Sequence, residues 1–100
     1  MVKSVRWTTG AQFDRKDIFS YWNSRNKSTI YSRKLYQLFK ENIKLIQKHP
    51  TIGRLIKRDD IRFSIVRDYL IVYKEMQEEI IIISIWDSRQ NPDRLIERIK

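Results

Sequence analysis

The sequence predicts a single α+β domain over residues 1–100, in which two N-terminal helices pack on a small, mostly antiparallel sheet. Three observations predict it. Apolar residues recur with a period of 3.6 over 31–46, β-branched and aromatic stretches fill 61–86, and 100 residues suffice for one core. Helices followed by a run of strands favour a layered α+β arrangement. The expected order is β-α-α-β-β-β, with a possible short helix at the end.

The first strand and helix are expected between residues 2 and 27. Residues 2–7 are rich enough in Val and Trp for a short strand. Thr9 and Gln12 then have the spacing of a capping box, which predicts a helix start. One face of this helix carries Ala11, Ile18, Phe19 and Trp22. The polar stretch 23–27 should end it.

The second helix has the clearest pattern in the chain. Ser28 is its expected N-cap, and His49-Pro50 should end it, because a proline disfavours helical backbone in the residue before it. Residues 51–54 are then expected to form a loop. The apolar stripe consists of Tyr31, Leu35, Leu38, Phe39, Ile43 and Ile46.

The second half of the chain changes to a strand pattern. Strands are expected at 61–67, 69–73 and 80–86, with Asp68 in the first turn and the polar stretch 75–79 in the second. Four consecutive isoleucines at 80–83 show no alternation, so both faces of the last strand should be covered, in the interior of the sheet. Asn91-Pro92 offers a cap followed by proline, which favours a short helix over 93–99.

The net charge of +9 predicts an anionic partner. Residues 1–50 hold 11 basic and 3 acidic side chains, whereas residues 51–100 hold 10 and 9. Nucleic acid and an acidic protein segment both fit this asymmetry, and a solubilising surface without a partner is the alternative. On the second helix the basic face comprises Arg33, Lys40, Lys44 and Lys48, which we interpret either as a docking surface or as an ordinary solvated face.

Several classes of chemistry are not expected. The sequence has no cysteine and a single histidine, so we expect no metal site and no cofactor. Its two glycines stand alone, which argues against a phosphate-binding loop. The longest apolar run is far shorter than the roughly 20 residues of a membrane span, and residues 1–6 lack the apolar segment of a secretion signal. We therefore expect a cytoplasmic protein without a membrane partner.

The remaining candidate chemistry is that of arginine on the sheet. Arg62, Arg67 and Arg89 lie on or near expected strands and could bind phosphate during RNA cleavage. Such a reaction is helped by a proton carrier, for which Tyr73 or His49 is available. The alternative is that Tyr69 and Tyr73 pack or line the edge of the sheet and that His49 is structural or solvated.

The order of elements and several short motifs resemble the RelE/ParE superfamily of toxins. The matching segments are the first helix with Ala11, Ile18 and Tyr21-Trp22, the segment 49–54 (His-Pro-Thr-Ile-Gly-Arg), Arg62 with the stretch 67–73, and the closing segment 83–92. The resemblance implies the toxin of a bacterial type II toxin–antitoxin pair, which stops growth and is neutralised by a cognate antitoxin. It also implies that an acidic or amphipathic antitoxin segment crosses the basic surface.

The superfamily divides by mechanism, and two positions favour its ParE-like members, which are associated with inhibition of DNA gyrase. RelE-like members cleave mRNA in the ribosome, and many carry an arginine directly after the tyrosine of the third strand and a tyrosine or histidine beyond the last strand. Here Leu70 follows Tyr69, and residues 87–93 contain neither tyrosine nor histidine. An mRNA endonuclease using Arg62, Arg67, Arg89 and Tyr73 is the alternative, and a non-toxic nucleic-acid-binding module is the third.

Overall fold

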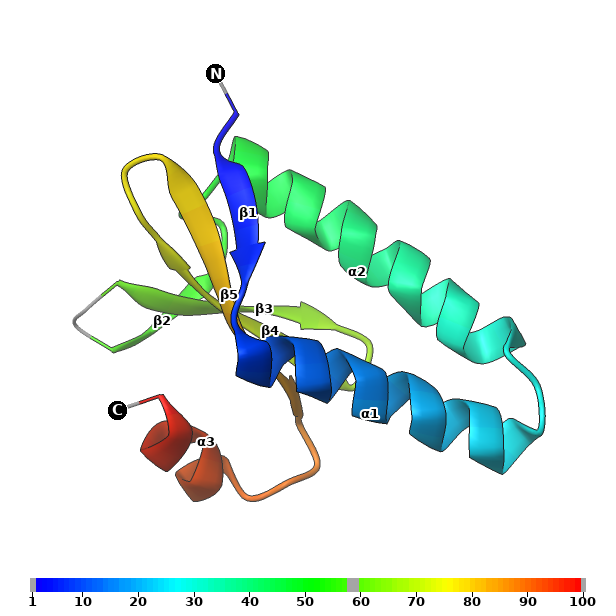
Figure 1. Ribbon diagram of the computed structural model, residues 1–100. Coiled ribbons are helices and arrows are strands. Elements are labelled where there is room, and N and C mark those ends of the chain that lie inside the picture. Colours follow the sequence, from blue (N-terminus) through cyan, green and yellow to red (C-terminus); the bar gives the residue numbers. More distant parts are fainter. Residues whose placement is uncertain (1, 58–59, 100) are drawn as a thin grey trace.

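The computed structural model describes residues 2–57 and 60–99, and this part of the chain forms three helices and five strands (Figure 1). The predicted α+β order is confirmed, with one further strand ahead of the three expected after the helices. In chain order the elements are β1 (Ser4–Trp7), α1 (Thr9–Asn26), α2 (Ile30–Lys48), β2 (Arg54–Lys57), β3 (Ile61–Val66), β4 (Tyr69–Glu75), β5 (Glu79–Asp87) and α3 (Pro92–Arg98).

The five strands form one sheet in the order β1-β5-β4-β3-β2. Only β1 and β5 are parallel, and the other neighbours are antiparallel, as predicted. β5 lies between β1 and β4, and none of its isoleucines at 80–83 is exposed, which confirms an interior strand. The additional strand, β2, begins at Arg54, where the sequence predicts a loop. It is a four-residue edge strand, and an edge with a single neighbour imposes little alternation on the sequence.

Both long helices begin one residue away from the predicted cap. Thr8, rather than Thr9, caps α1, and its Oγ1 accepts a hydrogen bond from the Ala11 backbone N–H at 3.1 Å. The helix continues through the polar stretch 23–26 and ends at Lys27, whose φ of 50° is left-handed. For α2 the N-cap is Thr29, one residue after the predicted Ser28, and the predicted end at His49 is confirmed. Neighbouring Ser and Thr residues are all competent caps, so tertiary packing decides between them.

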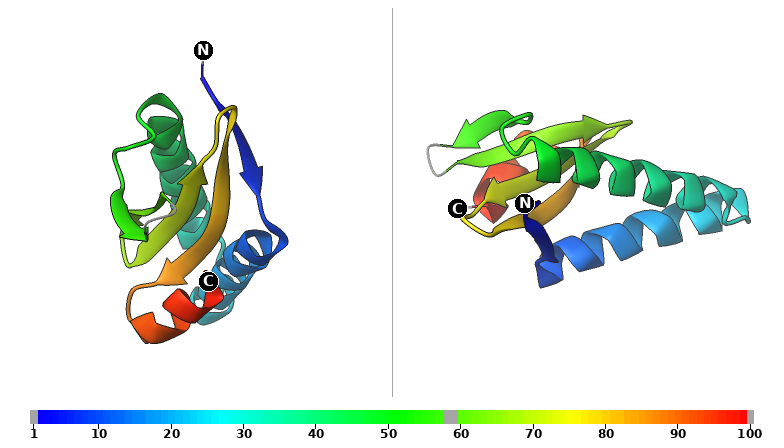
Figure 2. Two further views of the ribbon diagram at one scale, coloured as in Figure 1. Left: turned by 90° about the vertical axis from the view of Figure 1, so that its left-hand side faces the viewer. Right: turned by 90° about the horizontal axis from the view of Figure 1, so that it is seen from above.

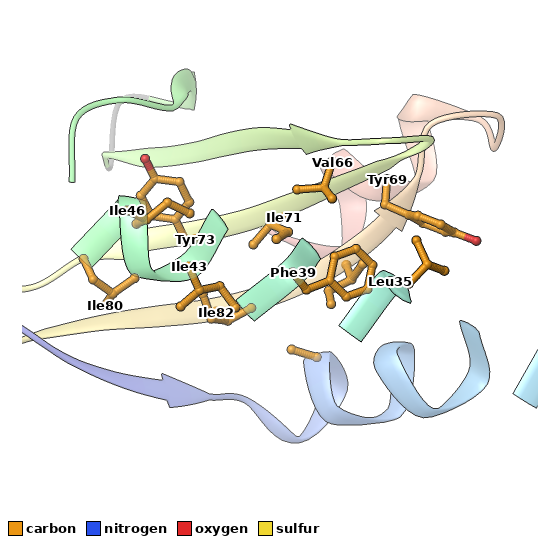
Figure 3. Close-up of a cluster of buried hydrophobic side chains, with 12 residues drawn as sticks. Leu35, Phe39, Ile43, Ile46, Val66, Tyr69, Ile71, Tyr73, Ile80 and Ile82 are labelled. Carbon is orange, nitrogen blue, oxygen red and sulfur yellow. The ribbon is translucent and has the colours of Figure 1, made fainter. Parts of the chain in front are cut away.

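The main core lies between the helical pair and one face of the sheet (Figure 3). The predicted stripe of α2 faces this core, with Leu35, Phe39 and Ile46 almost completely buried. From the sheet, β4 contributes Tyr69, Ile71 and Tyr73, and Figure 3 shows the hydroxyl groups of the two tyrosines at opposite ends of the cluster. The α1 side chains Ala11, Ile18, Phe19 and Trp22 also pack here, as predicted.

The short helix α3 covers a second, smaller cluster on the other face of the sheet. Leu95 and Ile99 pack there with Trp86 and Val72. The predicted start of this helix is confirmed, because the Asn91 side chain accepts a hydrogen bond from the Asp93 backbone N–H at 3.0 Å and Pro92 is the first helical residue. Figure 2 shows the twisted sheet with α1, α2 and α3 from two further directions.

Helix α1 supplies a hydrogen-bond acceptor to β5 at the point where its pairing with β1 ends. β1 pairs with β5 only as far as Trp7 and Ile82. Beyond that point the Asp14 carboxylate accepts hydrogen bonds from the Ser84 hydroxyl at 3.0 Å and from the Ile85 backbone N–H at 3.1 Å. A helix side chain thus replaces a missing strand partner, so the buried backbone of β5 keeps a hydrogen-bond acceptor where no strand pairs with it.

No helix in the described part of the chain is long and apolar enough to cross a membrane.

Candidate functional surfaces

Tyr73 and Arg62 meet at the loop between α2 and β2, because they are directly paired on β4 and β3. The Tyr73 hydroxyl donates to the Pro50 carbonyl at 2.8 Å and accepts from the Gly53 backbone N–H at 2.9 Å. The Arg62 Nη1 donates to the Gly53 carbonyl at 2.8 Å. A second, longer bond of 3.4 Å joins Arg62 to the Thr51 carbonyl. Two strand side chains therefore fix the conformation of this loop.

Gly53 is required at this loop by close approach. A Cβ at this position would lie 2.6 Å from the Tyr73 hydroxyl oxygen and 2.8 Å from the Phe63 carbonyl oxygen. Both distances are shorter than a carbon atom tolerates, and the Phe63 carbonyl belongs to the sheet backbone, so it cannot move aside. The segment 49–54 that carries part of the family resemblance therefore has a structural explanation.

The environment of Tyr73 does not favour proton exchange with a substrate. The side chain is 0% exposed, and burial raises the pKa of its hydroxyl above the ordinary 10.0. Both sides of the hydroxyl are occupied by loop backbone. The other candidate proton carrier, His49, is exposed and is the C-cap of α2, where its backbone N–H donates to the Leu45 carbonyl.

Arg67 and Arg89 lie at the other end of the sheet. Arg67 occupies the two-residue turn between β3 and β4 and has a left-handed φ of 58°. Arg89 binds Asp87 through Nε at 3.0 Å and Nη2 at 2.8 Å. This pairing lowers the pKa of Asp87 and raises that of Arg89. Five residues separate Arg62 from Arg67, which corresponds to about 16 Å along a strand, so the four predicted nuclease residues do not form one cluster.

The surroundings of Arg89 do not favour an anion. It lines a pocket of about 460 Å³ together with the carboxylates of Asp14, Asp17 and Asp87. The guanidinium is paired with Asp87, and two further carboxylates line the same pocket, so the pocket opposes the approach of a phosphate. The buried Tyr69 hydroxyl at this pocket accepts a hydrogen bond from the Trp22 indole N–H at 2.7 Å. In the part of the chain that the structure describes, no group of three metal-ligating His, Asp or Glu side chains occurs.

A basic groove runs between α1, α2 and β1. Two of the predicted docking residues, Lys40 and Lys44, line a pocket of about 270 Å³ there, whereas Arg33 and Lys48 are exposed elsewhere on α2. A neighbouring pocket of about 580 Å³ shares Arg15 and Tyr36 with the first, so the two adjoin, and we call them together the groove. The apolar lining of this groove comprises Val5, Trp7, Phe13, Phe19, Tyr36, Phe39 and Ile43, and its basic lining comprises Arg15, Lys16, Lys40 and Lys44.

The groove combines aromatic surface with positive charge. Phe13 is 60% exposed, and the ring of Tyr36 is also exposed. The Arg15 guanidinium lies over the Trp7 ring, 4.4 Å from its centroid, a cation–π contact that holds one basic group at the rim. An exposed apolar patch rimmed by polar groups is typical of a protein-binding surface.

Comparison with known proteins identifies the family. The family model described as the ParE toxin of type II toxin–antitoxin system, parDE, matches residues 5–92. The chain belongs to the ParE toxin family.

A solved structure has the same fold as this ParE-family chain. It is described as the chromosomal ParDE TA system from P. aeruginosa, and the match has a TM-score of 0.72 with 20% sequence identity. It covers 84% of this chain and 94% of that chain. A search of curated proteins finds no match.

Three features of this ParE-family chain were not predicted from its sequence. They are the acceptor role of Asp14 at the β5 edge, the hydrogen bond from Trp22 to Tyr69, and the fixing of the loop at Gly53. The sequence signal for the last was an isolated glycine in the predicted loop 51–54. The other two join residues 71 and 47 positions apart, which no local pattern reports.

Proposed function

We propose that this chain is the toxin of a type II toxin–antitoxin pair and that it stops growth by binding DNA gyrase. Family membership supports the toxin assignment. One observation carries the choice of binding over catalysis: the residues available for RNA cleavage are dispersed, and no proton carrier is free beside Arg62. Both sides of the Tyr73 hydroxyl are occupied by loop backbone, and Arg89 is paired with Asp87.

The groove between α1 and α2 is the proposed docking site of the cognate antitoxin. Its aromatic floor suits the apolar face of an amphipathic segment, and Lys40, Lys44 and Arg15 suit acidic side chains on the same segment. Arg33 and Lys48 extend the positive charge along the exposed side of α2. Complementary charge of this kind speeds association and sets the register of the bound segment.

Growth assays test the toxin assignment. Induced expression of the chain should arrest growth, and co-expression of a small neighbouring gene with an acidic tail should restore it. Normal growth despite expression would favour a non-toxic nucleic-acid-binding module. Primer extension on translated mRNA tests the RelE-like alternative, since new 5′ ends that disappear in Arg62→Ala or Arg67→Ala would indicate an endonuclease.

Charge reversal tests the antitoxin groove. Lys40→Glu and Lys44→Glu should each weaken antitoxin binding, and Lys34→Glu is the matched control because Lys34 is an exposed lysine of α2 that does not line the groove. Equal weakening by all three variants would show a general charge effect and would contradict a defined groove.

A further inference from the structure

The loop fixed by Tyr73 presents a second exposed surface, at the edge of the sheet formed by β2. Ile52 in the loop is 49% exposed and Leu55 on β2 is 56% exposed. Leu55 is directly paired with Arg62, so their side chains project from the same face of the sheet. Because Arg62 also binds the Gly53 carbonyl, its guanidinium lies against the loop that leads into β2. We call Ile52, Leu55 and Arg62 the β2 corner.

The β2 corner is held in one conformation before any partner arrives. Within residues 49–53, the Ile52 backbone N–H donates to the His49 carbonyl at 2.9 Å, and Tyr73 and Arg62 fix Pro50 and Gly53. A loop with this many internal bonds loses little conformational entropy on binding. A loop that is already held in one conformation suits a surface that binds.

Arg62 keeps donors available at this corner. Its Nη1 makes both bonds to the loop carbonyls, whereas Nε and Nη2 have no acceptor among the residues that the structure describes. A guanidinium positioned at one nitrogen can still bind a carboxylate through its remaining N–H groups. Aliphatic side chains on either side of such a group exclude water and strengthen the contact.

The charge around the β2 corner defines the chemistry of its partner. From residue 42 to residue 57 the sequence has four lysines and arginines and no acidic residue. Of these, Lys48 at the end of α2 is exposed beside the loop, whereas Arg54, which is paired with Phe63, projects from the other face of the sheet than Leu55. The exposed aromatic residues of the described chain, Phe13, Tyr21 and Tyr36, all belong to the helices. Nucleic-acid bases bind by stacking on aromatic rings, so an aliphatic, basic corner favours an acidic protein segment.

We propose that the β2 corner binds the protein that the toxin inhibits, through a carboxylate placed on Arg62 and an apolar side chain placed between Ile52 and Leu55. This inference rests on the proposed function. The antitoxin groove includes Val5 and Trp7 of β1, at the opposite edge of the five-stranded sheet. Four strand spacings, about 19 Å, separate the two edges. On its α2 side the groove extends to Lys44 and Gln47, but none of the three corner residues lines it, so the corner is a separate surface that a different partner can contact.

Variants that place a negative charge on the exposed apolar residues of the corner test this proposal. Ile52→Asp and Leu55→Asp should each require at least about tenfold more expressed protein to arrest growth, since truncating or reversing a central contact typically costs that much affinity. Arg62→Lys keeps the charge but loses the planar set of donors, and should weaken toxicity in the same direction. Ile65→Asp is the matched control, because Ile65 is a 61% exposed strand residue on the other face of the sheet.

Antitoxin affinity, measured on the same purified variants, separates the outcomes. Unchanged antitoxin affinity with reduced toxicity supports the β2 corner as a target-binding surface and shows that the variants are folded. Full toxicity of Ile52→Asp and Leu55→Asp would overturn the proposal, as would a loss of antitoxin binding with toxicity retained. New mRNA 5′ ends that vanish in Arg62→Lys would assign the corner to RNA. A wild-type chain that never arrests growth would overturn the toxin assignment, and the corner would lose its partner with it.

Discussion

Replacing Tyr73 by phenylalanine removes one oxygen atom that holds two backbone groups of the α2–β2 loop. The ring stays in place, so the core keeps its volume, but the Pro50 carbonyl and the Gly53 N–H lose their partner. An unsatisfied buried backbone group costs about 1–3 kcal/mol. Because Arg62 still holds the other side of the loop, we expect a total loss of about 2–4 kcal/mol in the free energy of unfolding. For a domain of this length that lowers Tm by about 10–20 °C.

Urea denaturation followed by tryptophan fluorescence measures this loss, and amide hydrogen exchange at Gly53 locates it. The matched control is Tyr21→Phe, since Tyr21 is exposed and its hydroxyl accepts only a 3.3 Å bond from Arg25. That variant should stay within about 0.5 kcal/mol of the wild type. If Tyr73→Phe is equally neutral and the Gly53 amide exchanges at its normal rate, the hydroxyl does not fix the loop. Lost toxicity with unchanged stability would instead indicate a catalytic tyrosine.

Three other variants or conditions test further parts of the structure. Asp14→Ala should lower the free energy of unfolding in urea by about 1–3 kcal/mol, because it leaves the Ile85 N–H without its acceptor. Asp14→Asn keeps an acceptor oxygen and should recover most of that loss. Equal losses in the two variants would contradict the contact at the edge of β5. Lys27→Gly should gain about 1 kcal/mol, since glycine adopts the left-handed φ of 50° without strain; no gain over Lys27→Ala in thermal unfolding would refute this. Burial raises the pKa of Tyr73 in the folded state above the ordinary 10.0 of the unfolded chain. The free energy of unfolding is therefore unaffected by this group below pH 10, and it falls as the pH rises from 10 through the folded-state pKa, because the unfolded chain loses the proton first. Tyr73→Phe should flatten that alkaline slope in denaturation series, and an unchanged slope would assign it to other groups.

The parts of the fold that the sequence predicted are those in which burial repeats along one element. The stripe of α2 follows the helical period because one side of the helix contacts the sheet, and the isoleucines of β5 are unbroken because both of its faces are covered. The sequence does not decide between neighbouring residues that can each play the same local role, such as capping a helix. Thr8 and Thr9 can both cap a helix, and the structure selects Thr8, whose hydroxyl also donates to the Ile83 carbonyl.

The types of residue in the sequence indicated candidate sites, but they did not reveal what each residue does in the structure. If their side chains were free, Tyr73 and Arg62 would both suit the chemistry of phosphate transfer. Their actual partners are Pro50 and Gly53, which lie 23 and 9 positions away, so their structural role becomes visible only when the strands are paired. The basic face of α2 was predicted, whereas the groove that Lys40 shares with aromatic residues of α1 depends on how the two helices pack.

Supercoiling by purified DNA gyrase in the presence of the purified chain is the most direct test of the proposed function. We expect inhibition that increases with the amount of toxin and is relieved by a stoichiometric amount of the cognate antitoxin. Supercoiling that is unaffected at any toxin concentration, in cells whose growth the same chain arrests, would contradict gyrase as the target.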